Sequence, residues 1–65
     1  MTLVAQARQL RAALNRAPKT AATGAHRQMA GRRIADVLLL AGRNDHAAEI
    51  RLAEARFHAQ HVIDA

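Results

Sequence analysis

The chain has 65 residues, a formal net charge of +5 and no cysteine. The lack of cysteine excludes disulfides and thiolate metal sites, and a chain this short buries only about 60% of the surface that its unfolded form exposes. Because such a core leaves little margin of stability, we expect one domain, residues 1–65, supplemented by oligomerisation or by a binding partner.

The composition favours helices. About half of the hydrophobic residues are alanine, which has the highest helix propensity, while β-branched residues are few and Phe57 is the single aromatic residue. We therefore predict an all-α fold. It is either a small three-helix bundle or a helical hairpin plus an N-terminal helix, completed by oligomerisation.

The first predicted helix spans residues 3–16, with Thr2 as its N-cap. Apolar residues recur along it at spacings of four and three, which places on one face Leu3, Ala7, Leu10, Leu14 and Ala17. Pro18 ends the helix, because proline lacks an amide hydrogen and disfavours helical geometry in the residue before it. A turn through APKTAATG, residues 17–24, should follow.

The second predicted helix spans residues 25–41, with Thr20 or Thr23 as its N-cap and Gly42 as its C-terminal signal. Its apolar stripe consists of Ala30, Ile34, Val37, Leu38 and Ala41. Gly31 inside this helix costs up to about 1 kcal/mol relative to alanine. We expect it to mark either a close contact between helices or a later helix start.

The third predicted helix spans residues 46–63, and either Asn44 or Asp45 can cap it. One apolar stripe contains Ala48, Leu52, Ala55, Ala59 and Val62. A second stripe beside it contains Ile50, Ala53 and Phe57. A helix with two apolar faces is expected to have two neighbours.

Residues 37–40 are four large apolar residues in succession. Since each residue advances about 100° around a helix, together they surround most of its circumference. The other two helices can cover two of its sides, and a third apolar side needs a second copy or another protein. We therefore expect a homodimer or higher oligomer, with association residues Leu38, Leu39, Leu40, Leu52 and Phe57.

Charge is divided unevenly along the chain. Residues 1–33 contain seven arginines or lysines and no acid, whereas residues 34–65 contain three arginines and five acids. Such asymmetry indicates an acidic partner for the first half, and a solvated face is the simpler alternative. The predicted contact residues are Arg8, Arg11, Arg27, Arg32 and Arg33.

Nucleic acid is an alternative partner for these arginines, through duplex phosphates. The basic half contains no aromatic residue on which bases could stack, so recognition of single-stranded RNA is disfavoured. A helix-turn-helix with GRND, residues 42–45, as its turn is also disfavoured. Its reading helix, residues 46–63, would be apolar on two sides and would carry no net positive charge.

A metal site has only weak candidates. Glu54, His58 and His61 share one helical face, but they leave the coordination shell incomplete unless His26, His46 or a symmetry mate adds a ligand. In the simpler interpretation these histidines are partly exposed and have ordinary carboxylate neighbours on the helix. We therefore expect no metal and no cofactor.

The segment LLLAGRNDHAAEIRLAEARFHAQ, residues 38–60, is similar to a tetratricopeptide helix pair. The likeness lies in the small residues, the glycine-containing turn and the spaced alanines of the second helix. Such folds stack several repeats at a period of about 34 residues, and the chain contains no second copy. The family is therefore not assigned.

The sequence contains no HExxH pattern, phosphate-binding glycine loop or nucleophile motif, so we expect no enzyme. It also lacks a long apolar run and a signal peptide, which predicts a cytoplasmic protein without a membrane span. Nine arginines against one lysine fit a GC-rich bacterial or phage genome. The expected function is a self-associating interaction module (an adaptor, inhibitor or structural subunit) with a basic surface for an acidic partner. The alternative is a nucleic-acid-binding regulator or packaging accessory.

Overall fold

The boundaries of the helices follow the capping residues of the sequence. In a computed structural model that describes all 65 residues, the helices are α1 (Leu3–Arg16), α2 (Gly24–Leu40) and α3 (Asp45–Ile63). A short 3-10 helix, η1 (Ala21–Thr23), precedes α2, and there are no strands. The predicted all-α class is confirmed, and each predicted helix boundary lies within one residue of the observed one.

Side-chain caps begin two of the helices. The Thr2 hydroxyl accepts a hydrogen bond from the Ala5 amide at 3.0 Å, and the Asn44 side chain accepts one from the Ala47 amide at 3.2 Å. At α2 the predicted cap is wrong, because neither Thr20 nor Thr23 binds a free amide of that helix. Their hydroxyls instead lie 2.9 Å apart and bond to each other, so η1 leads into α2.

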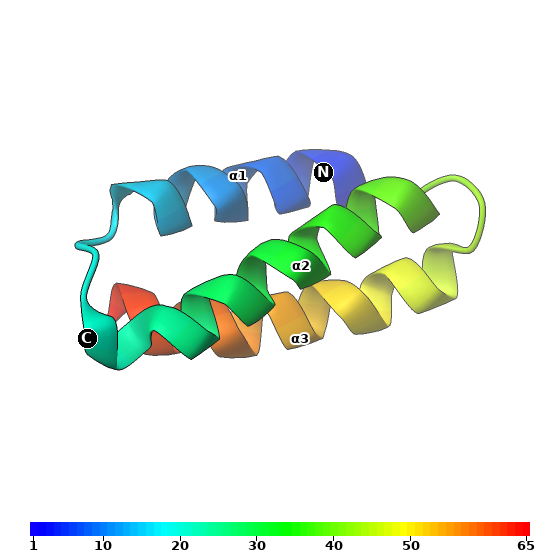
Figure 1. Cartoon of the computed structure of the whole chain (residues 1–65). Coiled ribbons are helices and arrows are strands. Elements are labelled where there is room, and N and C mark those ends of the chain that lie inside the picture. Colours follow the sequence, from blue (N-terminus) through cyan, green and yellow to red (C-terminus); the bar gives the residue numbers. More distant parts are fainter.

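The three helices pack as an antiparallel bundle with extents of 35 × 18 × 14 Å (Figure 1). The hairpin of α2 and α3 has the most extensive contact, and α1 packs against both helices. Ten buried residues form the core: Ala7, Leu14, Ala30, Ile34, Val37, Ala48, Leu52, Ala55, Ala59 and Val62. Because half of them are alanine, the buried side-chain volume is small.

The predicted apolar stripes have different outcomes. Every member of the first stripe of α3 is buried. The second stripe, Ile50, Ala53 and Phe57, is exposed, so within one chain α3 has no neighbour on that side. On α2, Val37 is buried whereas Leu39 is 68% exposed, which leaves one side of this helix uncovered as well.

Gly31 marks neither a close contact nor a helix start. A Cβ atom built on it meets no heavy atom within 4 Å, and α2 begins seven residues earlier, at Gly24. Gly42 differs, because its φ of 82° lies in the left-handed region that disfavours other residues. It allows the chain to leave α2 and turn into α3.

Replacing Gly31 by alanine should raise the free energy of unfolding by about 0.5–1 kcal/mol, because alanine costs less backbone entropy and its methyl group meets no neighbour. Gly42→Ala is the matched control, and it should lower the same quantity by about 1 kcal/mol because of its positive φ. Urea denaturation followed by circular dichroism, at one protein concentration, measures both. A destabilised Gly31→Ala variant would contradict this account.

Candidate interaction surfaces

The five arginines predicted to contact a partner fall into two groups. Arg27 and Arg33 are half-buried and bonded within the chain. Arg8, Arg11 and Arg32 are exposed and form no salt bridge. Only Arg8, Arg11 and Arg32 can bind a partner without the loss of a contact within the chain.

Arg27 binds the C-terminal end of α1. Its guanidinium donates hydrogen bonds to the carbonyl oxygens of Leu14 at 2.9 Å, Ala17 at 3.0 Å and Pro18 at 3.0 Å. The carbonyls at the C-terminal end of a helix carry its partial negative charge, so a cation stabilises them. The Leu14 carbonyl also accepts a hydrogen bond from the Ala17 amide at 3.2 Å. The Nε of Arg27 is buried without a partner. Arg27 therefore joins α2 to the end of α1.

Arg33 belongs to a group of four charges, the ion-pair quartet, that links α2 to α3. Arg33 bonds Glu54 at 3.1 Å, Arg51 bonds Glu54 at 2.6 Å, and Asp36 lies 3.7 Å from Arg51 and 3.8 Å from Arg33. The Arg51 hydrogen bond has the largest effect on the Glu54 carboxyl and lowers its pKa. Burial raises this pKa by a smaller amount, and the Arg33 hydrogen bond lowers it again. Glu54 is therefore ionised, and its carboxylate is already paired with two arginines of the same chain.

A histidine cluster lies beside the quartet, where the start of α2 meets the end of α3. The Nδ1 atoms of His26 and His58 are 3.0 Å apart, and the ring of His61 stacks on that of His26 with centroids 4.1 Å apart and planes 10° apart. Phe57 meets the His61 ring edge-on at 4.9 Å. The bond between His26 and His58 needs one donor and one acceptor nitrogen, so at least one of these rings is neutral.

The three metal candidates do not converge on one point. His58 and His61 approach His26, whereas Glu54 is held by two arginines. No group of three or more histidine, cysteine or acidic side chains is arranged to hold a metal ion. The spacing within α3 grouped Glu54 with His58 and His61. In the structure, the packing of α2 on α3 brings His26 to these two histidines, and Glu54 lies apart with its arginines.

Burial lowers the pKa of His26, and the nearby His61 and His58 lower it further. Protonation of His26 would remove its capacity to accept a hydrogen bond and would place a cation beside two other imidazoles. The cluster therefore favours a neutral His26 in the folded chain.

The predicted association residues are also divided. Leu52 is only 3% exposed and belongs to the core of the single chain, so it cannot lie on an exposed interface. Leu40 is half-buried against the same core. Leu38, Leu39 and Phe57 are 36%, 68% and 60% exposed. These three remain available for association.

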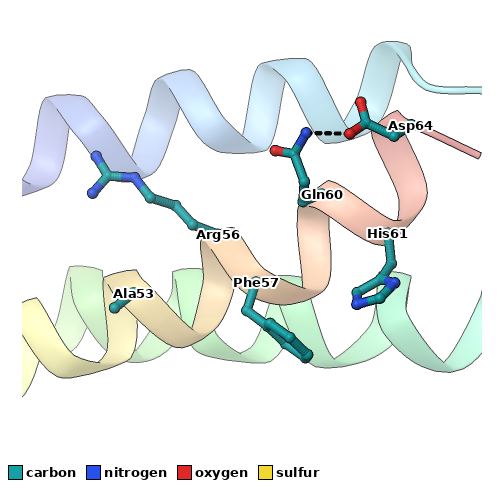
Figure 2. A pocket seen from close by; sticks show the side chains of 6 residues that line it. All are labelled: Ala53, Arg56, Phe57, Gln60, His61 and Asp64. Carbon is teal, nitrogen blue, oxygen red and sulfur yellow. Dashed lines mark hydrogen bonds between the residues drawn. The ribbon is translucent and has the colours of Figure 1, made fainter.

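An open groove follows the outer side of α3, around Phe57. In Figure 2, Phe57 and His61 project from one side of the helix and Arg56 and Gln60 from the other, with Gln60 bonded to Asp64. Ala53 completes the lining. The groove joins an exposed aromatic ring to charged and amide groups, which is a composition suited to protein contacts.

Comparison with known proteins yields no protein family, curated protein or solved structure that matches the chain. None of its helices is both long enough and apolar enough to cross a membrane.

Arg27→Ala should lower the free energy of unfolding by about 1–3 kcal/mol, because it leaves three carbonyl oxygens at the end of α1 without their charged donor. Arg32→Ala removes the same charge from an exposed, unpaired position and should change it by less than about 0.5 kcal/mol. Urea denaturation measures both variants. Equal changes in the free energy of unfolding for the two variants would show that the hydrogen bonds of Arg27 do not stabilise the fold.

The stability of the fold should fall as the pH drops below about 6.5. Because the folded-state pKa of His26 lies below its ordinary value of 6.5, the unfolded chain takes up this proton first. The neutral cluster therefore contributes stability above pH 6.5, and that contribution is lost as the pH falls through the lower folded-state pKa.

Urea midpoints at about pH 7.5 and about pH 5.5 measure this effect above the ordinary titration range of the carboxylates. His26→Asn should reduce the difference between the two midpoints. His46→Asn, which removes an exposed histidine outside the cluster, should preserve most of it. An unchanged pH dependence in His26→Asn would refute the role of the cluster.

Proposed function

We propose that this protein is a small non-enzymatic interaction module that self-associates and presents a basic surface, formed by α1 and α2, to an acidic protein partner. Such a module would act as an adaptor, an inhibitor or a structural subunit. The observation that carries the proposal is Leu39, which is 68% exposed on α2 and lies in the sequence between Arg32 and Arg43, two arginines without a salt bridge.

The cations around Leu39 come from the sequence before and after it. Arg32 lies two helical turns earlier on the same side of α2, and Arg43 lies in the turn that follows. Neither forms a salt bridge, and both are exposed. An exposed apolar side chain thus lies between two positive charges that form no ion pair within the chain.

Two arginines of α1 extend this surface. Gln6 bonds Arg56 of α3 at 2.7 Å, which places the Gln6 flank of α1 toward α3. Helical geometry then places Arg8 and Arg11, on the opposite flank, toward α2. We define the basic face as the exposed residues Arg8, Arg11, Arg32, Leu39 and Arg43.

An acidic amphipathic helix fits the basic face better than nucleic acid does. Its carboxylates would pair with the arginines while its apolar side chains cover Leu39, as in helix-in-groove recognition. Phosphates would satisfy the arginines and leave the leucine in water. The exposed leucine therefore favours a protein partner.

Binding to duplex phosphates is the second candidate. It is favoured by the unpaired cations of α1 and the following loop, which include Arg16 and Lys19 besides Arg8 and Arg11. Phosphate contacts depend strongly on salt because each one releases counterions, whereas an apolar contact persists at high salt. Salt dependence therefore separates the two candidates.

Fluorescence anisotropy with two labelled probes tests the proposal. One probe is a designed helical peptide with leucines at spacings of three and four and glutamates on both flanks, and the other is a random DNA duplex. We expect the peptide to bind more tightly and to lose less than tenfold in affinity between about 50 and 200 mM salt, whereas phosphate binding through four cations loses about 100-fold or more. Preferential binding of the duplex with that steep slope would contradict the proposal.

Leu39→Ser and Arg32→Ala should each weaken peptide binding by about tenfold, which corresponds to about 1.4 kcal/mol. Arg16→Ala is the matched control, because it removes an exposed, unpaired charge outside the basic face. Circular dichroism should show unchanged helicity in all three variants. If Arg16→Ala weakens binding as much as Arg32→Ala, the interaction depends on net charge and the basic face is wrong.

A further inference from the structure

We propose that the outer side of α3 is the contact surface of an antiparallel homodimer, in which α3 of one copy packs against α3 of a second copy. This inference rests on the self-association in the proposed function and assigns a surface to it. That surface is separate from the basic face, so one copy can bind a second copy and an acidic partner at the same time.

The outer side of α3 carries a stripe with coiled-coil spacing. Successive members are separated by four, three, four, three and four residues, and we define this outer stripe as His46, Ile50, Ala53, Phe57, Gln60 and Asp64. All six residues are exposed, with Ile50 at 48% and Phe57 at 60%. Over its 19 residues and the C-cap Asp64, α3 thus has one face buried in its own chain and a second, partly apolar face that nothing covers.

The stripe is complementary to itself when it is read in the opposite direction. A two-fold axis between Ile50 and Ala53 packs each Ile50 against the small Ala53 of the second copy. The same register brings Phe57 onto His46 of the second copy. Large side chains then meet small or flat ones across the contact.

Charge favours the same arrangement. Glu49 forms no hydrogen bond or salt bridge within its chain, and it lies on the same flank of the stripe as Arg56, two turns away. In the antiparallel register Glu49 faces Arg56 of the second copy, and this pair occurs twice. Arg56 bonds Gln6 through one nitrogen, and its other donors are free for a carboxylate. Parallel pairing would instead oppose like charges.

The other exposed apolar surface does not suit a second copy. Leu39 is flanked by Arg32 and Arg43, so pairing two such surfaces would bring unpaired cations together in a chain that already carries +5. The flanks of the outer stripe carry both signs of charge. The second copy therefore fits α3, and the acidic partner fits α2.

Charge-reversal variants examined by sedimentation equilibrium test the homodimer. Because one helix offers less than the standard ~800 Å² per partner, we expect a dissociation constant of about 1–100 µM for the unmodified chain. Glu49→Arg alone and Arg56→Glu alone should each weaken the dimer about tenfold or more. Mixing the two variants should restore association, because the mixed dimer contains two opposite-charge pairs.

The matched control is Arg16→Glu, an equal charge reversal on α1 that should leave the dimer intact. Glu49 and Arg56 are about 10 Å apart along one helix, so they cannot compensate each other within a chain. Failure of the mixture to associate more tightly than either variant alone would overturn the proposed contact. Circular dichroism of each variant confirms that these exposed positions do not affect folding.

Single cysteines test the direction of the helices, because the chain contains no cysteine of its own. Ala53→Cys, near the two-fold axis, should form a disulfide-linked dimer on oxidation, and His46→Cys should not. Cross-linking of His46→Cys would show parallel packing and overturn the antiparallel arrangement.

A protein that stays monomeric at millimolar concentration also overturns the homodimer. The acidic peptide would still bind the basic face in that case, so a monomeric protein would not contradict the proposed acidic partner. Conversely, a dimer that responds to Glu49 and Arg56 but ignores the peptide supports α3 self-association and contradicts the acidic partner.

Discussion

The small side chains of the core constrain the rest of this structure. Five of the ten buried core residues are alanine, and the largest fully buried side chains are Ile34, Val37 and Val62. Apolar burial stabilises a fold in proportion to area, so three helices joined by such a core have a low margin. Polar contacts between helices and association between chains therefore contribute a larger share of the stability here than in a larger domain.

The internal polar contacts account for a large share of the charged residues. Arg27 fixes the end of α1, and the ion-pair quartet spans the exposed edge between α2 and α3. Partly exposed ion pairs contribute little individually, and a network of four contributes more because its members hold one another in place. Arg8, Arg11, Arg32 and Arg43 lie outside these contacts and form no ion pair, which is why we assign the basic face to them.

Local signals in the sequence predicted the helices well. Thr2, Pro18, Gly42 and Asn44 act within a few residues of their own positions, so their effects do not depend on the rest of the fold. The buried stripe of α3 was predictable for the same reason, since its spacing alone defines one face.

The sites required information that local spacing lacks. Whether the guanidinium of Arg27 or of Arg32 is free to bind a partner depends on how α1 packs against α2. The spacing of residues along the sequence does not predict that packing. The grouping of His26 with His58 and His61 joins residues more than 30 positions apart. Leu52 was assigned to an interface because the sequence does not show which apolar side a neighbouring helix of the same chain will cover.

The measurement that most directly tests the central claim is the urea midpoint of the unmodified protein as a function of protein concentration. If a second copy covers the outer stripe of α3, association stabilises the folded chain by mass action and the midpoint rises as concentration rises through the dissociation constant. A midpoint that stays constant from micromolar to millimolar concentration would show that a single copy is sufficient, and it would contradict this account.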